Sequence, residues 1–231
     1  MTSLSKNARV AGLLYILSSL FSVVRLIYIP SALFVHGNAS ATANNIASQE
    51  LLFRLGIVSY LLCNILWVFV ILALFRLLKG VDQALAVLMV ILGLMVTPIS
   101  FVNTVNDVVA LLFARGTDFL SVFDKAQREA LVMLFINLHD QLDLANDFWG
   151  LCFIPFGLLV YKSRFLPRIL GVWLMVVCVA YLALSFTGLL FPAYEARVIP
   201  IAQPVLFGEV AVMLWLLIVG AKEKPLAATS S

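Results

Sequence analysis

Residues 50–78 read ELLFRLGIVSYLLCNILWVFVILALFRLL, and this stretch decides the fold class. No charged side chain occurs between Arg54 and Arg76. A helix needs about 20 mostly apolar residues to cross a bilayer, and this stretch exceeds that length. Similar apolar stretches recur along the chain. One of the predicted helices starts near Lys125, and Ser121 or Asp124 is expected to cap it. The predicted spans cover approximately residues 10–34, 50–78, 84–113, 125–161, 166–191 and 201–221.

The composition points to the same class of protein. Of the 231 residues, 63% are hydrophobic and 12% are charged. A soluble domain is about 45–50% apolar and about 25% charged, so this chain has more apolar surface than a core of its size can hide. We therefore predict an all-α polytopic membrane bundle of about six transmembrane helices, folded as a single transmembrane domain over residues 1–231.

Basic residues predict the orientation of the bundle, because Lys and Arg are enriched in cytoplasmic loops. With both termini in the cytoplasm, that side holds nine of the 15 basic residues and only two acids, Asp82 and Glu223. The net charge of +3 is small and dispersed, which argues against nucleic-acid binding. The nine basic residues are Lys6, Arg9, Arg76, Lys79, Lys162, Arg164, Arg168, Lys222 and Lys224.

Ionisable and amide side chains interrupt the predicted spans at one common depth. A charged group at the bilayer centre costs about 2.5–3.5 kcal/mol on insertion scales, so such groups usually face the bundle interior. They fall late in odd-numbered spans and early in even-numbered spans. Because consecutive spans run in opposite directions and the N-terminus is predicted in the cytoplasm, all of these residues lie toward the outer leaflet. The set comprises Arg25, Arg54, Asn103, Asn106, Asp107, His139, Asp140, Asp143, Asn146, Asp147, Gln203 and Glu209.

The spacing of these residues predicts polar helix faces. His139, Asp143 and Asp147 fall on one face of the fourth span. Asn103 and Asp107 share a face of the third span. Side chains of this kind cannot face lipid, so we expect them to converge inside the bundle. Glu50 and Arg54 are spaced i, i+4, as expected for an ion pair on a helix surface.

Three interpretations of this polar cluster are open. The acids and arginines could neutralise one another and lock the helices together. They could instead line an outward-facing acidic pocket that binds or transports a small polar or cationic solute. The third interpretation is a metal site or membrane-embedded hydrolase, with His139 and Asp143 as the weak candidate ligands and His36 folding over from a loop. The predicted pocket residues are Arg25, Arg54, Asn103, Asp107, His139, Asp143, Asp147 and Glu209.

Motifs of soluble enzymes do not occur in the chain. There is no GxGxxG, Walker loop, HExxH or GxSxG sequence, so no catalytic residue is predicted. Cys63, Cys152 and Cys178 lie inside apolar runs without CxxC spacing, which is typical of buried small hydrophobes. No cofactor is predicted, and a divalent metal enters only through the third interpretation.

Several segments together resemble a known family. The chain opens with ARVAGLLY at residues 8–15, and ANNI at 43–46 leads into ELLFRLGI at 50–57. Leu138 and His139 follow in the fourth span, and SRFLPRILGV covers residues 163–172. In this order the segments resemble the bacterial integral membrane family called domain of unknown function 4386. The resemblance implies about six helices and a bacterial inner-membrane location, and it implies no activity.

The sequence therefore favours a non-enzymatic membrane protein that binds or transports a small polar or cationic solute. A metal-dependent membrane enzyme and a structural or accessory subunit of a membrane complex are the two alternatives. The expected partners are the lipid bilayer and a small solute. The sequence does not identify an oligomeric state.

Overall fold

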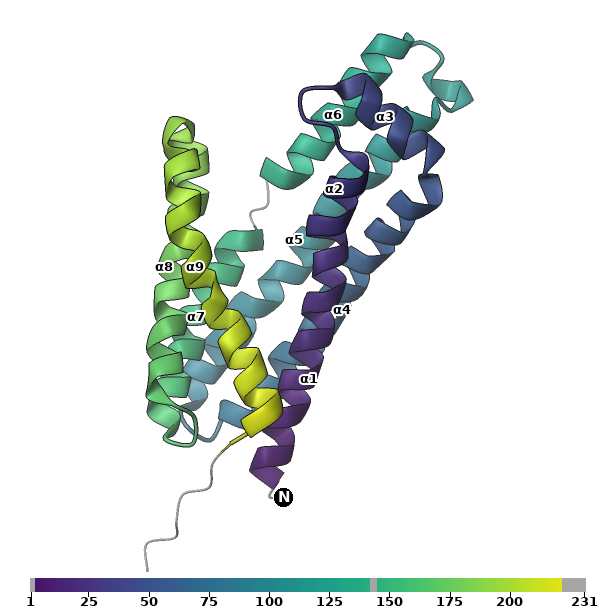
Figure 1. Cartoon of the computed structure of the whole chain (residues 1–231). Helices are drawn as coiled ribbons and strands as arrows, with labels where there is room; N and C mark the ends of the chain where they lie inside the picture. The colour runs from purple at the N-terminus through teal and green to yellow at the C-terminus, as the bar shows by residue number, and fades with distance from the viewer. Residues whose placement is uncertain (1–2, 142–144, 222–231) are drawn as a thin grey trace, which may run out of the picture. The chain divides into compact units, whose positions relative to one another are not determined.

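The computed structural model describes residues 3–141 and 145–221, with the backbone alone at residues 140, 141, 145 and 146. In these ranges the chain is helical and has no strand, in agreement with the predicted all-α class (Figure 1). The longer helices are α1 (Ser3–Val23), α3 (Ala39–Ser48), α4 (Glu50–Leu78), α5 (Gln83–Arg115), α6 (Lys125–Gln141), α7 (Ala145–Ser163), α8 (Arg168–Leu190) and α9 (Glu195–Leu214). Shorter elements are η1 (Val24–Tyr28), α2 (Ile29–Leu33), η2 (Asp118–Leu120), η3 (Pro192–Tyr194) and η4 (Trp215–Val219).

Five helical runs in the described ranges are long and apolar enough to cross a membrane. They are Ser3–Leu33, Glu50–Leu78, Gln83–Arg115, Arg168–Leu190 and Pro192–Val219. Each matches a predicted span, and the protein is a membrane protein by this criterion. The first and last runs begin earlier than predicted, because their polar first turns are also helical.

The predicted fourth span, residues 125–161, is described as two helices. Helix α6 ends at Gln141 and α7 begins at Ala145, and the residues between them lie outside the described ranges. The expected cap at the start of α6 is confirmed for Asp124, whose Oδ1 accepts a hydrogen bond of 2.8 Å from the backbone N–H of Gln127. The Gln127 side chain in turn accepts from the Asp124 N–H at 2.9 Å, which completes a capping box.

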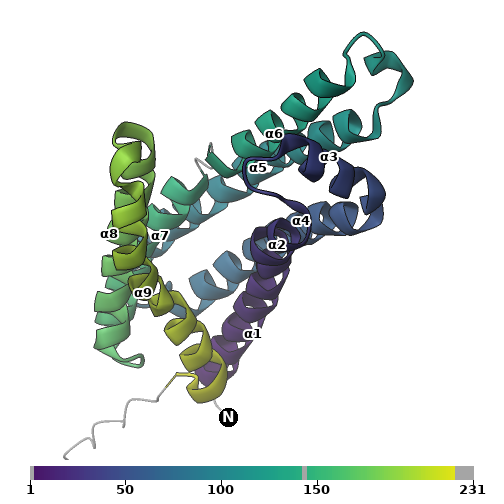
Figure 2. The same ribbon diagram turned by 45° about the horizontal axis from the view of Figure 1, so that its top comes forward.

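The described chain divides into two compact units, each of which takes part of α1, α4 and α5. One unit, here called the α3–α6 unit, comprises, among the described residues, 17–66, 97–141 and 145. In it α3 packs on α6, as both views show (Figures 1 and 2). Its core is apolar and includes Ile29, Leu33, Ile46, Phe53 and Ile136.

The other unit, here called the α7–α9 unit, comprises, among the described residues, 3–16, 67–96 and 146–221. Helices α8 and α9 form an antiparallel hairpin, which lies side by side in both views (Figures 1 and 2). Small residues bring α7 and α8 together, since a Cβ added to Gly157 would lie 2.6 Å from the carbonyl oxygen of Gly171. Close backbone approach of this kind is typical of helix packing in membranes.

Two segments of the apolar runs have wider helical turns than an α-helix. The five residues of η1, which include Arg25, form a π-helical turn inside the run Ser3–Leu33. A second π-helical turn, η4, ends the run that contains α9. Such turns are rare and frequently occur at functional sites. The sequence analysis did not predict either of them.

Candidate functional site

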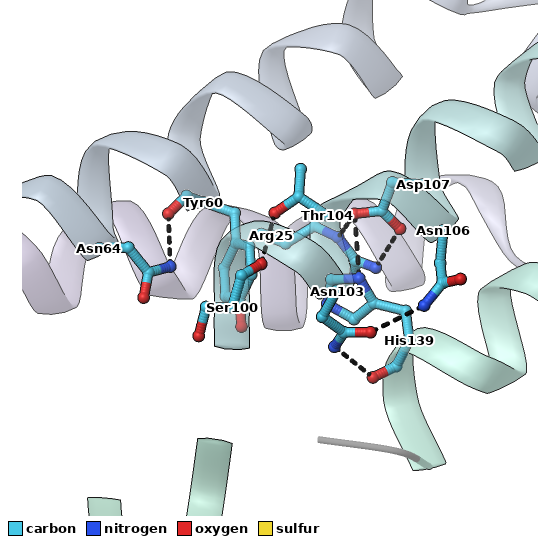
Figure 3. Close-up of polar contacts among 9 residues, drawn as sticks. All are labelled: Arg25, Tyr60, Asn64, Ser100, Asn103, Thr104, Asn106, Asp107 and His139. Carbon is cyan, nitrogen blue, oxygen red and sulfur yellow. Dashed lines mark hydrogen bonds and ion pairs between the residues drawn. The ribbon is translucent and has the colours of Figure 1, made fainter. Parts of the chain in front are cut away.

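A buried ion pair joins η1 to α5 in the α3–α6 unit (Figure 3). Arg25 Nη2 donates to Asp107 Oδ1 at 2.7 Å, and Arg25 Nε donates to Asp107 Oδ2 at 3.0 Å. The two side chains are 1% and 0% exposed. The two parallel bonds are the bidentate geometry that an Arg guanidinium offers to a carboxylate. The positive charge of Arg25 and the negative charge of Asp107 therefore neutralise each other in the buried interior of this unit.

His139 of α6 is the third member of this arrangement. Its Nδ1 lies 3.2 Å from Asp107 Oδ2, within ion-pair range, and its side chain is 2% exposed. The ring of Tyr60 packs against the imidazole at a centroid distance of 5.2 Å. His139 Nε2 is buried and has no hydrogen-bond partner among the described residues. Arg25, Asp107 and His139 are called the triad below.

Two asparagines hold the end of α6 against α5. Asn103 Nδ2 donates to the backbone carbonyl of His139 at 2.9 Å. Asn106 Nδ2 donates to Asn103 Oδ1 at 2.8 Å, so both amides of the predicted α5 face are engaged (Figure 3). These bonds fix where His139 lies along Asp107. The triad can hold the helices in register, and its side chains are almost fully buried.

Arg54 does not join the triad, although the sequence analysis placed it in the same site. Its side chain is 48% exposed, and Nε donates to Glu50 Oε1 at 2.7 Å in the predicted i, i+4 pair. Arg115 approaches the other oxygen of Glu50 at 3.4 Å. Helix α4 therefore directs Arg54 toward the surface, where an exposed pair contributes little stability.

Glu209 lies in the α7–α9 unit and has a different set of partners. Tyr181 Oη donates to Glu209 Oε1 at 2.7 Å, and Tyr15 Oη donates to Oε2 at 3.1 Å. Trp149 Nε1 lies 3.4 and 3.3 Å from the two carboxylate oxygens and donates to them. Glu209 is 8% exposed. The sequence analysis placed Glu209 early in a span that begins at residue 201. Because α9 begins at Glu195 instead, Glu209 lies past the middle of this helix.

The donors of Glu209 belong to a chain of packed aromatic rings. Trp67 stacks on Trp149 at a centroid distance of 4.0 Å and meets Tyr15 edge-on at 5.4 Å. Phe153 packs between Trp149 and Tyr181, at 6.4 and 6.1 Å. Trp67 Nε1 is engaged elsewhere, because it donates to the Gly93 carbonyl at 2.8 Å. These five rings and Glu209 are called the aromatic box below.

The two buried carboxylates differ in electrostatics. Asp107 is balanced by the guanidinium of Arg25, whereas Glu209 has only neutral donors among the described residues. Trp149 can donate but cannot accept a hydrogen bond, so it favours a carboxylate that carries negative charge. A charge in an apolar bundle is costly unless a partner of opposite sign neutralises it. Of these two buried carboxylates, Glu209 is therefore the one without a charged partner in the described part of the chain.

The remaining predicted site residues are distributed differently. Asp147 lies in the first turn of α7, and its Oδ1 is buried with no hydrogen-bond partner among the described residues. Gln203 is exposed. Asp143 lies outside the described residues, and so do the side chains of Asp140 and Asn146.

A metal site is not assembled in the described part of the chain. No group of three His, Cys, Asp or Glu side chains gathers there closely enough to hold an ion. The second histidine, His36, is exposed, and the other candidate ligand, Asp143, is not described. The three cysteines are buried and free.

A surface hollow of about 80 Å³ lies in the α3–α6 unit, between α3, α5 and α6. None of the predicted pocket residues lines it. Its walls are Ala43, Asn44, Phe113, Ala114, Lys125, Arg128 and Glu129. Lys125, which is exposed, and Glu129, which is partly buried, form an i, i+4 pair there at 3.7 Å.

The sequence analysis missed the residues that surround Glu209 and His139. Trp149 lies in an apolar run, where a tryptophan is ordinarily expected to be a packing residue. The sequence around Tyr15, Tyr60 and Tyr181 likewise gives no indication that these side chains contact a polar group. With 17 Phe, 6 Tyr and 4 Trp in the chain, aromatic residues are too common to single out a site. The one available signal was Glu209 itself, an acid in an apolar span with no basic residue nearby in sequence.

Comparisons with known proteins identify the family. An uncharacterised protein of Archaeoglobus fulgidus is 32% identical over 91 residues, which is 38% of this chain and 51% of that protein. The match thus spans about half the length of that relative. No solved structure matches. The family model described as "Domain of unknown function (DUF4386)" matches residues 10–220. The chain therefore belongs to the DUF4386 family, which its sequence motifs had suggested.

Proposed function

We propose that this protein binds or transports a small cationic solute in the membrane, with Glu209 as the cation-binding carboxylate. The observation that carries the proposal is the buried carboxylate of Glu209, which is surrounded by neutral donors and aromatic rings and has no basic partner in the described part of the chain. An acidic side chain inside a membrane bundle is costly and usually functional. A bound cation supplies the missing positive charge.

The comparison with Asp107 supports this choice of site. Arg25 already neutralises Asp107, so a cation that entered the triad would meet a guanidinium of its own sign. Glu209 has only neutral donors around it in the described part of the chain, so a cation there would meet no like charge. The proposal therefore moves the solute site from the predicted outward-facing acidic cluster to the aromatic box.

The proposal includes a topology. Helix α7 is 19 residues long, or about 28 Å at about 1.5 Å per residue, close to the thickness of about 30 Å of a hydrocarbon core. We propose that α7 is the sixth span, that both termini lie in the cytoplasm and that the membrane is the bacterial inner membrane. The ion pair between Lys162 and Asp82 then lies on the cytoplasmic side, where Lys and Arg concentrate.

Cation binding to protein in lipid nanodiscs tests the proposal. Calorimetric titration with sodium, potassium and methylammonium chlorides is expected to give saturable heat for at least one cation. The substitution Glu209→Gln keeps the shape and removes the charge, so it should abolish that binding. The matched control is Glu195→Gln, which neutralises an exposed carboxylate at the start of the same helix. Uptake into proteoliposomes then separates transport from binding.

Two results would reject this function. The first is the absence of saturable binding for every cation tested. The second is equal loss of binding in the Glu209→Gln and Glu195→Gln variants, which would place the effect at the surface.

A structural or accessory role in a membrane complex is the second candidate. The closed triad favours it, because balanced and buried charges fix helix positions without needing a ligand. This role predicts normal folding and no cation binding in the same titration.

A further inference from the structure

We infer that the hollow between α3, α5 and α6 binds the phosphate group of a membrane phospholipid. This site lies in the α3–α6 unit and does not depend on the proposed role of Glu209. The observation that carries the inference is an open space of about 80 Å³ whose walls include the cationic side chains of Lys125 and Arg128. A single water needs about 10–15 Å³ of such space, so a group of several heavy atoms can enter.

The charge of the walls suits a phosphodiester. Lys125 and Arg128 contribute +2 and Glu129 contributes −1, so the lining carries a net charge of +1. Glu129 is already engaged, because Ser40 Oγ donates to its Oε1 at 3.0 Å and Lys125 Nζ lies 3.7 Å from the same oxygen. The phosphodiester of a phospholipid carries a single negative charge and would neutralise the walls.

Arg128 is positioned before a ligand arrives. Its Nη1 donates to the Phe123 carbonyl at 2.8 Å, which is the one hydrogen bond of this guanidinium to the described residues. The guanidinium also packs against Gly116, where an added Cβ would lie 3.4–3.6 Å from Nε, Cζ and Nη2. Nε and Nη2 therefore remain available to a second partner, and a planar guanidinium is well suited to phosphate oxygens.

The hollow lies at the level where membrane-spanning runs end. Phe113 and Ala114 line it and belong to the last turn of the run Gln83–Arg115. The run Glu50–Leu78 begins at the same level, because Arg115 approaches Glu50 at 3.4 Å. Lipid headgroups lie where spans leave the hydrocarbon core, so a lipid phosphate can reach the hollow without leaving the bilayer.

The segment that links α5 to α6 supports a lipid as the source of the phosphate. It exposes two large apolar side chains, Phe119 at 69% and Val122 at 82%. Apolar side chains close to Lys and Arg are typical of segments at the boundary between headgroups and acyl chains. A free phosphate ion would use the cations alone, whereas a lipid offers acyl chains to Phe119 and Val122 as well.

Lipid binding to the whole chain in detergent tests the inference. Native mass spectrometry measures the binding of phosphatidylglycerol, of a diacylglycerol with the same acyl chains and of inorganic phosphate. We expect one phosphatidylglycerol to bind saturably, about tenfold or more tightly than the diacylglycerol, because the latter has no charge for Lys125 and Arg128. Inorganic phosphate at the same concentration should not displace the lipid.

Charge variants locate the site. Lys125→Gln and Arg128→Gln should each weaken phosphatidylglycerol binding about fivefold, as expected for one basic side chain near a lipid headgroup. Arg115→Gln is the matched control, because Arg115 is exposed at the end of α5 and pairs with Glu50 outside the hollow. It should leave lipid binding nearly unchanged.

A size variant separates a built site from general attraction to a cationic surface. Ala114→Leu adds side-chain volume to the wall of the hollow and changes no charge, so it should weaken phosphatidylglycerol binding about as much as Arg128→Gln does. Ala47→Leu is its control, because Ala47 is exposed on α3 and does not line the hollow.

Three results would overturn the inference. Equal binding of phosphatidylglycerol and diacylglycerol would show that the phosphate is not recognised. Equal loss in Arg115→Gln and Arg128→Gln, or no loss in Ala114→Leu, would show attraction to the surface in general. Displacement of the lipid by inorganic phosphate would make the free ion the ligand. If Ala114→Leu does not fold, the charge variants decide, and none of these outcomes bears on Glu209.

Discussion

The carboxylate of Asp107 contacts two side chains, one from η1 and one from α6. Oδ2 is shared, since it accepts from Arg25 Nε and lies within 3.2 Å of His139 Nδ1. A buried charge whose partner is removed is strongly destabilising, whereas replacing both partners by apolar residues is often neutral. The stability of the α3–α6 unit should therefore depend on the balance of charge at this position more than on the ion pair itself.

Changing Asp107 alone should thus cost more than changing the whole pair. We expect Asp107→Asn to lower the free energy of unfolding by about 3–5 kcal/mol, because Arg25 keeps its charge without a carboxylate. The double variant Arg25→Met with Asp107→Leu should lie closer to the unmodified protein. Reversible unfolding in mixed micelles measures both.

The exposed pair of Arg54 and Glu50 provides the matched control. Glu50→Gln should cost about 1 kcal/mol or less, because water screens this pair. Equal destabilisation by Asp107→Asn and by the double variant would contradict the argument from charge balance.

At this scale the sequence predicted part of the site. Arg25, Asp107 and His139 stand out because ionisable residues in apolar runs are rare, and the structure brings them together. From the sequence, Arg54 looked equivalent to Arg25. The exposure of a residue near a helix end depends on how the helix is rotated about its axis, and hydropathy does not determine that rotation. Tyr15 and Tyr181 could not be predicted as partners of Glu209, because their role depends on contacts between distant helices.

Among the helices, the contact of α7 with α8 depends on the absence of side chains at two positions. Gly157 and Gly171 face each other so closely that a Cβ on either would lie 2.6 Å from the other's carbonyl oxygen. In a membrane, helices associate through close packing rather than through the hydrophobic effect. This pair of helices also carries Trp149 and Tyr181 of the aromatic box.

Adding one methyl group at this contact should separate the two helices. We expect Gly157→Ala to cost about 1–3 kcal/mol of stability, as is usual for overpacking of a tight contact. Gly80→Ala is the control, because a Cβ at Gly80 meets no atom within 4 Å. Thermal unfolding in nanodiscs compares the two, and equal melting temperatures would argue against a tight α7–α8 contact.

Sequence patterns predicted most of the elements. Apolar length was sufficient for five runs, since a span needs little more than enough hydrophobic residues. The predicted span 125–161 covers both α6 and α7, and its continuity stays a prediction because residues 142–144 lie outside the described ranges. The π-helical turns were missed for another reason: one extra residue in a turn leaves the hydropathy profile unchanged.

At the scale of the whole molecule, many hydrogen bonds among the described residues join segments that are far apart in the chain. One of them lies outside the apolar runs, where Lys162 Nζ of α7 donates to Asp82 Oδ2 at 2.9 Å. That hydrogen bond is the main reason that the pKa of Asp82 lies below its ordinary value of 3.8, with a further contribution from the backbone N–H of Leu85. The turn between α4 and α5 is thus tied to the end of α7.

This tie predicts a particular dependence on pH. Because the folded state lowers the pKa of Asp82, the carboxylate contributes stability above the unfolded value of 3.8, and that contribution disappears as the pH falls through the folded value. The Asp82→Asn variant should therefore lose the same contribution at neutral pH and show a flatter stability profile below about pH 4.

Unfolding measured from pH 7 down to pH 3 in low salt and high salt tests this expectation, because Asp82 is exposed enough for salt to screen the pair. Parallel profiles for the two proteins would show that the tie contributes nothing.

At this largest scale, membrane class and family followed from composition and motifs, and both are confirmed. A single domain with six spans and cytoplasmic termini stays a prediction. Hydropathy reports the length of each span but not which side chains of distant spans meet. The partners of Asp107 and of Glu209, which differ in charge, therefore had to come from the structure.

The wide turn at Val24–Tyr28 has a consequence for how this chain can vary. In an α-helix each residue rotates the next by about 100°, so deleting one residue ordinarily moves every following side chain to another face. A turn that already holds an extra residue can absorb such a deletion by becoming α-helical. A one-residue deletion in the first run should therefore be tolerated best around Arg25, where it would keep the rest of the helix in phase but change how Arg25 lies against Asp107.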